Sequence, residues 1–151
     1  MKKKLHAEDG AILKVDFAPT PEEGFLSCKP KPPFPFHDNS ITLLSAAHII
    51  EKIPRDAFIP FMDECWRVLK FNGQMRLAAY YAGSTPFWSD PLHVNGTTVQ
   101  TWSYFDPLQY NGALYRKYKP KPWKVESVFS QVDNTMEVLL SKRRPDKSYE
   151  K

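Results

Sequence analysis

The chain has 151 residues, 42% of them hydrophobic, and a formal net charge of +4 at pH 7. This length suits one domain with a sizeable core. No apolar run approaches a membrane span, and no apolar stretch follows the basic N-terminus as in a signal peptide. Cys28 and Cys65 lack the spacing of a zinc site or a disulfide framework. We therefore expect a protein of a reducing compartment, the cytoplasm, with no metal and no membrane.

Part of the positive charge lies at the two ends of the chain, in "MKKK" and "SKRRPDKSYEK". We expect a domain over 1–142 followed by a basic C-terminal tail over 143–151. Such ends are usually solvated, but they also attract nucleic acid in a salt-sensitive way without reading its sequence. The segment "YRKYKPKPWK" (115–124) adds further basic residues. Nucleic acid is therefore one candidate partner.

The first third of the chain predicts strands joined by loops. "KKKLHA" (2–7) fits a short first strand, and "AILKVDF" (11–17) fits a second because it alternates and is β-branched. "FLSC" (25–28) is a weaker third strand. A proline-rich connection follows, and "SITLLSAA" (40–47) fits a fourth strand because its apolar run is nearly continuous.

The rest of the chain predicts one long helix and a terminal hairpin. Apolar residues recur at helical spacing over 56–70, with Pro60 expected in the first turn and Gly73 expected to end the helix. "QMRLAAYY" (74–81) is the next strand, and a short helix is predicted near 98–105. "WKVESVFSQ" and "TMEVLLSK" flank "VDN" and predict an antiparallel pair.

Together these elements predict an α/β sheet, mostly parallel, with an antiparallel C-terminal hairpin. Ligands of such sheets bind beyond the carboxyl ends of the strands, at the point where the strand order reverses. Several polar residues are expected close to those ends: Asp16, Cys28, His48 and Tyr81. We therefore expect a ligand site along that edge.

Two consecutive stretches of the chain match one known family. "PFPFHDNSITLLSAAHIIEKI" and "FMDECWRVLKFNGQMRLA" resemble the middle of class I S-adenosylmethionine-dependent methyltransferases, of the small type 11-like kind. The family has a "P-F-x-D-N-S" loop, an "H-x-x-E-H" turn and a helix ending in "R-V-L-K-P-G-G". The matching residues are Pro35, Phe36, Asp38, Asn39, Ser40, His48, Glu51, Arg67, Val68, Leu69, Lys70 and Gly73. The resemblance extends over about 34–142.

The resemblance implies a Rossmann-like methyltransferase sheet, S-adenosylmethionine as cofactor and methyl transfer to an oxygen or nitrogen nucleophile. The chain departs from the family in its cofactor loop, which is glycine-rich in the family so that backbone N–H groups approach the cofactor. Here "LHAEDGAILKVDF" contains Gly10 alone, so the N-terminal part is expected to be truncated. A second hypothesis is therefore a catalytically inactive binding or assembly module with this fold, for which nucleic acid is one candidate partner.

Besides Gly10, the resemblance assigns five residues to the cofactor. Asp16, at the end of the second strand, would accept the ribose hydroxyls, although a solvated turn residue fits as well. Ser27 and Cys28 would lie at the adenine edge, or are ordinary strand-end residues. Asp38 and Asn39 would order a loop over the adenine, or form an Asx turn.

Two histidines are the candidate catalytic residues. His48 follows the fourth strand, where a neutral imidazole could deprotonate an attacking oxygen or nitrogen. It could equally pack against the next turn and pair with Glu51. His93, in "SDPLHV", could contact substrate with Asp90 orienting it, or could simply bind backbone carbonyls of its loop.

Aromatic residues are frequent after the fifth predicted strand. They could line a substrate pocket or stack on a base, or form a satellite core under a long loop. The residues in question are Phe87, Trp88, Trp102, Tyr104 and Phe105.

Overall fold

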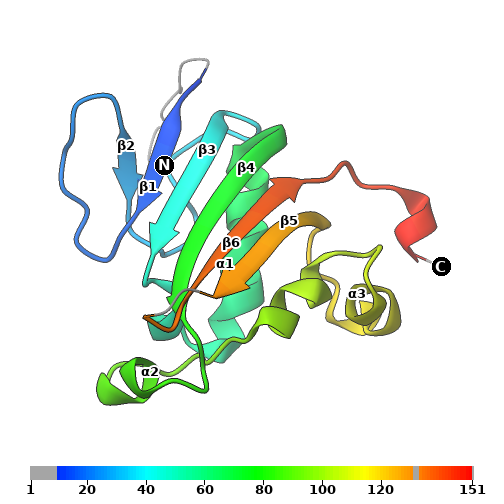
Figure 1. Cartoon of the computed structure of the whole chain (residues 1–151). Helices are drawn as coiled ribbons and strands as arrows, with labels where there is room; N and C mark the ends of the chain where they lie inside the picture. Colours follow the sequence, from blue (N-terminus) through cyan, green and yellow to red (C-terminus); the bar gives the residue numbers. More distant parts are fainter. Residues whose placement is uncertain (1–9, 131–132, 151) are drawn as a thin grey trace.

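The computed structural model describes residues 10–130 and 133–150. Six strands form one sheet in the order β2-β1-β3-β4-β6-β5 (Figure 1). The strands are β1 (Ile12–Val15), β2 (Leu26–Cys28), β3 (Ile41–Ala47), β4 (Leu69–Tyr80), β5 (Trp123–Ser130) and β6 (Thr135–Lys142). β1 to β4 are parallel, whereas β6 is antiparallel to β4 and β5. The predicted fold class, a mostly parallel sheet with an antiparallel C-terminal hairpin, is confirmed.

The helices are short, apart from one. The α-helices are α1 (Arg55–Val68), α2 (Thr85–Ser89) and α3 (Tyr110–Leu114), and the 3₁₀ helices are η1 (Ile50–Lys52), η2 (Val99–Phe105), η3 (Arg116–Tyr118) and η4 (Lys147–Glu150). η2 confirms the short helix predicted near 98–105. None of the described helices has the length and hydrophobicity needed to cross a bilayer.

The order of the first strands differs from that of nucleotide-binding sheets. In the order 3-2-1-4-5-6 the first strand separates the second from the fourth. Here β1, predicted as the second strand, is hydrogen-bonded directly to β3, predicted as the fourth, with Lys14 opposite Ser45. The first strand predicted over 2–7 lies outside the described residues. The sheet therefore reverses its order between β1 and β3.

One face of the sheet is buried under α1 (Figure 1). Phe61, Met62 and Cys65 of α1 belong to the same buried cluster as the sheet residues Leu44 and Met75. The cluster forms because α1 repeats apolar residues at helical spacing while the strands alternate.

The opposite sheet face carries polar side chains, many of them partly exposed, together with apolar ones such as Leu43 and Leu139. Lys14, Ser45 and Arg76 are level with one another across β1, β3 and β4, and Glu137 lies on β6. Alternation of apolar and polar residues is typical of a sheet with one face in water, whereas a doubly covered sheet is apolar on both faces. Among the described residues the fold is therefore two-layered.

Two predictions around α1 are wrong. Pro60 lies inside the helix rather than in its first turn, so the helix lacks one internal hydrogen bond there. Gly73 does not end the helix, because the chain passes directly from Val68 into β4. Gly73 instead lies within β4, where an added Cβ would come 2.6 Å from the carbonyl oxygen of Lys70. The backbones of Lys70 and of Thr42 on β3 come so close to position 73 that any side chain there would clash, which explains why this residue is a glycine.

The described part of the predicted basic tail folds back onto the domain. The Arg143 side chain donates a hydrogen bond to the Trp123 carbonyl (3.1 Å) and lies 3.3 Å from the Asp106 carboxylate. Asp146 directly precedes η4, and its carboxylate accepts a hydrogen bond from the Ser148 amide of η4. The chain that follows β6 is thereby held beside β5.

At the amino edge of the sheet, Lys142 is buried in an unusual environment. Its ammonium donates to the Leu69 carbonyl and the Asn39 side chain, both at 2.7 Å, and lies 4.0 Å from the centre of the Trp66 ring. Burial, which disfavours the charged form, lowers the pKa of Lys142 to about 8. The nearby Asp38 opposes this shift.

The lowered pKa predicts a pH-dependent stability. Between pH 8 and 10.5 the unfolded Lys142 keeps its proton and the folded one has released it, so the free energy of unfolding rises with pH. Relative to Lys142→Met, the wild-type protein should gain up to about 3 kcal/mol across this window. Urea denaturation of both proteins at several pH values measures this difference. A constant difference would contradict the assignment.

Candidate functional site

The carboxyl edge at β1 and β3 is the place where a sheet of this type binds ligands, because the strand order reverses there. Asp16 directly follows β1, and His48 directly follows β3. Since the two strands are neighbours, the residues that follow them lie near each other. This edge is the candidate site.

His48 adopts a backbone conformation that is uncommon for residues other than glycine. Its φ is 54°, in the left-handed region, and its amide donates to the Ala78 carbonyl at 2.7 Å. Such a conformation costs about 1–2 kcal/mol in a non-glycine residue. It turns the imidazole onto Tyr80, with ring centroids 4.4 Å apart. Strain of this kind is concentrated at functional sites.

A buried carboxylate orients the His48 ring. Glu51 in η1 is 1% exposed, and its Oε1 accepts a 2.6 Å hydrogen bond from the Tyr80 amide. The same oxygen lies 3.1 Å from Nδ1 of His48. When Nδ1 carries the proton and donates to Glu51, Nε2 becomes the acceptor. The His48 side chain is 39% exposed, so this nitrogen can meet a ligand.

The Glu51 carboxylate has a second feature. Its other oxygen, Oε2, is buried and has no hydrogen-bond partner among the described residues. Buried polar atoms are almost always paired, and exceptions point to function or strain. The His48–Glu51 pair therefore has the arrangement of a general base and the group that orients it.

The segment after α2 is held against this pair. The amides of Val94 and Asn95 both donate to the Glu51 carbonyl, at 2.7 and 3.0 Å. The buried Asn95 side chain donates to Ile50 and accepts from Arg55. These contacts connect residues forty or more positions apart, and no local sequence pattern signals them.

His93 lies behind His48 rather than beside a ligand surface. Its side chain is 5% exposed, with Nδ1 2.6 Å from the Phe87 carbonyl and Nε2 3.5 Å from Asp90. Its ring also packs against Phe87 and Tyr80. Both ring nitrogens are thus engaged. This geometry suits a residue that positions the loop better than one that contacts substrate.

The residues assigned to the nucleoside half of the cofactor lie on β1 and β2. Asp16 is exposed, and one carboxylate oxygen accepts from the Ala18 amide at 3.1 Å. Ser27 and Cys28 end β2, and the Asp16 amide donates to the Cys28 carbonyl. Burial, helped by the charge of Glu64, raises the pKa of Cys28 to about 12, so its thiol stays protonated. Asp16 therefore offers the accessible charge here.

Three other assigned residues lie at the opposite edge of the sheet, contrary to expectation. Gly10 forms an exposed turn before β1, with a φ of 84°. Asp38 and Asn39 precede β3, where Asp38 accepts from Arg67 at 2.6 Å and Asn39 accepts from Lys142. Because β1 and β3 run in the same direction, their amino ends are remote from Asp16 and His48. The contacts of Asp38 and Asn39 hold the loop before β3 at the amino edge of the sheet. This position does not fit the predicted role of ordering a loop over an adenine at the carboxyl edge.

The aromatic residues after β4 do not form one pocket. Trp102 and Phe105 are buried in the core against Phe58. Phe87 packs against His93, whereas Trp88 is 74% exposed. Trp102 and Phe105 thus belong to the main core of the domain, so neither the pocket nor the satellite-core hypothesis describes η2.

No group of three or more His, Cys, Asp or Glu side chains in the described ranges is placed to hold a metal ion. The two cysteines are free and buried.

Comparison with known proteins rests on structure. No family model matches the sequence, and no curated protein sequence matches it either. The YcgJ protein of Bacillus subtilis superimposes with a TM-score of 0.57 at 12% identity, over 93% of this chain and 94% of that one.

Two further structures carry a methyltransferase name. An S-adenosylmethionine-dependent methyltransferase from Mesorhizobium loti has a TM-score of 0.56 at 10% identity, over 87% of this chain and 80% of its own. A SAM-dependent methyltransferase from Methanosarcina mazei has a TM-score of 0.53 at 10% identity, over 91% and 94%. At such identities the likeness establishes the fold: the chain has the fold of class I S-adenosylmethionine-dependent methyltransferases, as the motifs predict.

The role of Glu51 in fixing this edge is testable by stability. Glu51→Ala leaves the Tyr80 amide buried without an acceptor, so we expect a loss of about 2–3 kcal/mol in the free energy of unfolding. Glu22→Ala removes an exposed carboxylate paired with Lys14 and should change stability by less than about 1 kcal/mol. Chemical denaturation compares the two variants. Equal effects would show that Glu51 does not anchor the edge.

Proposed function

We propose that this chain binds S-adenosylmethionine across the carboxyl edge of β1 and β3 and transfers a methyl group to an oxygen or nitrogen nucleophile beside His48. The observation that carries the proposal is the His48–Glu51 pair at the strand-order reversal. The methyltransferase fold supports it. The methyl acceptor is a small molecule or a macromolecule that reaches the exposed imidazole.

The residues at this edge fit the nucleoside half of the cofactor. Asp16 presents an exposed carboxylate after β1, and such a group accepts ribose hydroxyls in related sheets. For the methionine half the fit differs from a glycine-rich loop, because the stretch that corresponds to that loop contains Gly10 alone, and Gly10 lies at the opposite edge of the sheet. We therefore assign most of the cofactor affinity to the nucleoside half.

The chemistry needs alignment first and proton removal second. When bound, the cofactor supplies an electrophilic methyl group. His48 accepts the proton of the attacking hydroxyl or amine at Nε2, and Glu51 stabilises the imidazolium that forms. Tyr80 and the segment that carries Asn95 hold these two side chains in place, which lowers the entropic cost of alignment.

A non-catalytic binding module is the second candidate function. Direct pairing of β1 with β3 favours it, because the described sheet has no strand and glycine loop at the reversal. Calorimetry separates the two: micromolar binding of S-adenosylmethionine or S-adenosylhomocysteine supports the first function. No binding up to millimolar ligand supports the second.

Asp16 is the residue to change for cofactor binding. Asp16→Ala should weaken S-adenosylhomocysteine binding by about 1–3 kcal/mol, because two ribose hydroxyls lose their acceptor. Glu23→Ala removes an exposed carboxylate from the same loop and is the matched control. Isothermal titration calorimetry measures both. An unchanged affinity in Asp16→Ala removes Asp16 from the site.

His48 is the residue to change for catalysis. Asn tolerates the left-handed backbone, so His48→Asn should keep the fold and the cofactor affinity while lowering kcat about 10²–10⁴-fold. The measurement is transfer of a labelled methyl group to a panel of alcohols, amines and phenols.

Two controls make this test specific. His37→Asn changes an exposed histidine at the opposite edge and should leave transfer unchanged. An acidic phenol is already ionised and needs no base, so His48→Asn should slow its methylation far less. An equal loss for acidic and non-acidic acceptors would exclude a base role for His48.

A further inference from the structure

We propose that the surface beside β5 binds single-stranded nucleic acid, with phosphates against its lysines and arginines and bases stacked on its tyrosines. The surface is separate from the carboxyl edge at His48. It is formed by the chain from η2 to the start of β5 together with Pro145, Asp146 and the η4 residues Lys147 and Tyr149. The inference goes beyond methyl transfer and does not require it.

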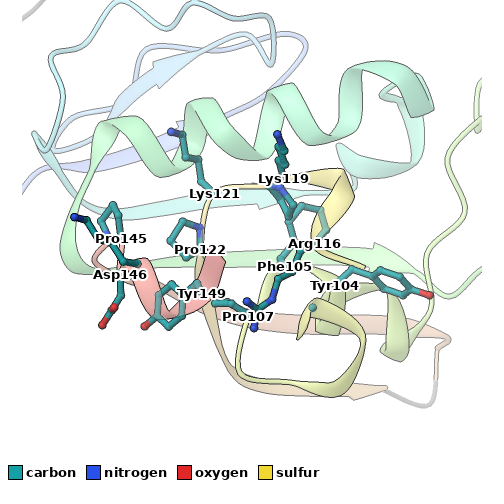
Figure 2. A pocket seen from close by; sticks show the side chains of 13 residues that line it. Tyr104, Phe105, Pro107, Arg116, Lys119, Lys121, Pro122, Pro145, Asp146 and Tyr149 are labelled. Carbon is teal, nitrogen blue, oxygen red and sulfur yellow. The ribbon is translucent and has the colours of Figure 1, made fainter. Parts of the chain in front are cut away.

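A cavity of about 700 Å³ lies at the centre of this surface. Figure 2 shows Lys119 and Lys121 on one side of the cavity and Tyr149 on the other. Pro107, Pro120, Pro122 and Pro145 also line it, and proline restricts backbone motion. The cavity is large enough for a nucleotide, because ligand sites measure about 300–1,000 Å³.

The charge of the cavity is strongly positive. Its lining includes Arg116, Lys119, Lys121 and Lys147 and a single carboxylate, Asp146. That carboxylate accepts a hydrogen bond from the Ser148 amide in η4, which lowers its pKa, so the lining still has more positive than negative groups. Clustered cations on one face are what phosphate binding requires.

The positive surface continues beyond the cavity. A second hollow of about 440 Å³ shares Pro145, Asp146 and Tyr149 with the first. It adds the cations Lys124, Lys142, Arg143 and Arg144 and one further carboxylate, Glu126, which lies 3.2 Å from the Lys124 ammonium. The two hollows are therefore adjacent, and their cations lie along a path rather than at one point. A path of this kind fits a polymer of phosphates better than a single anion.

Aromatic rings lie next to these cations. Tyr104 lines the cavity and stacks on Tyr115, with centroids 5.4 Å apart and planes at 28°. Tyr118 packs against both Tyr115 and Tyr104, with centroids 6.1 and 6.2 Å apart, so the three rings form one cluster. Tyr118 is 50% exposed, and an exposed ring is a platform for a base, whatever its sequence.

The walls of this surface are rigidly attached to the domain. The buried Asp106 accepts hydrogen bonds from the Val125 and Leu108 amides, both at 3.0 Å. On the other wall, the Trp66 indole donates to the Pro122 carbonyl and the Lys121 amide donates to Asp63. A rigid surface loses little conformational entropy on binding.

An acidic peptide is the competing ligand, since it would satisfy the cations. It would leave the stacked tyrosines without a partner, because carboxylate side chains do not stack on rings. The combination of ring faces and cations therefore favours bases joined by phosphates.

The test is fluorescence anisotropy of a labelled oligouridine of about 12 nucleotides with the full chain, at about 50 and 150 mM salt. We expect binding that weakens steeply with salt. The double variant Lys119→Glu, Lys147→Glu should weaken binding roughly tenfold or more. Lys29→Glu with Lys31→Glu makes the same charge change in the exposed loop after β2 and should alter affinity less than about twofold.

Stacking is tested at Tyr118. Tyr118→Ala should weaken binding roughly fivefold or more, and Tyr118→Phe should restore it because the ring is retained. The proposal is overturned if the wild-type chain does not bind at low salt, if both charge-reversal pairs act equally, or if Tyr118→Phe behaves like Tyr118→Ala. Displacement of the oligonucleotide by polyglutamate at equal charge concentration would also overturn it. Cofactor calorimetry on the charge-reversed variants, expected to be unchanged, keeps this result distinct from the proposed methyl transfer.

Discussion

The direct hydrogen-bonded pairing of β1 with β3 determines what the carboxyl edge can hold. Lys14 lies opposite Ser45, so two residues later Asp16 and Ala47 are level, and His48 follows at once. Neighbouring strands are about 4.8 Å apart. In a sheet with another strand between them, the same two groups would be twice as far apart. A ligand that reaches from Asp16 to His48 therefore crosses a short stretch of this edge.

Long-range contacts then make the edge rigid. Glu51 is the central group, because its side chain binds the Tyr80 amide and faces His48 while its carbonyl accepts the amides of Val94 and Asn95. β3, β4 and the chain after α2 are thus joined at one buried residue. The strained backbone of His48 persists because these contacts determine it on several sides. Glu51 therefore contributes both to the packing of this edge and to the proposed chemistry of His48.

Much of the fold could be predicted from the sequence, because it depends on local patterns. β-branched alternation located β1, and a nearly continuous apolar run located β3. Two strand-like segments around a turn located the β5–β6 pair, and helical spacing located α1. The prediction that Gly73 ends the helix was wrong, because in a sequence a glycine needed for close backbone packing looks the same as one that ends a helix. The pairing of β1 with β3 could not be predicted, because strand order depends on contacts between distant segments.

The candidate site was predictable only in part. His48 and Asp16 were found because both follow strands, and strand ends are visible in the pattern. Asp38 and Asn39 match a family motif, but the motif precedes its strand and so lies at the other edge. Tyr80 binds Glu51 through its backbone amide. Every residue except proline has such an amide, so the identity of residue 80 could not have predicted this contact.

The polar face of the sheet has a thermodynamic consequence. Lys14, Ser45, Arg76 and Glu137 keep that face hydrated in the described fold, so unfolding newly exposes less apolar surface than it does in a sheet covered on both sides. The heat capacity change of unfolding scales with newly exposed apolar area and is about 12–15 cal/mol/K per residue in ordinary domains. A value below that range gives a flatter curve of stability against temperature. The protein then resists cooling as well as moderate heating, with a modest maximum between the two.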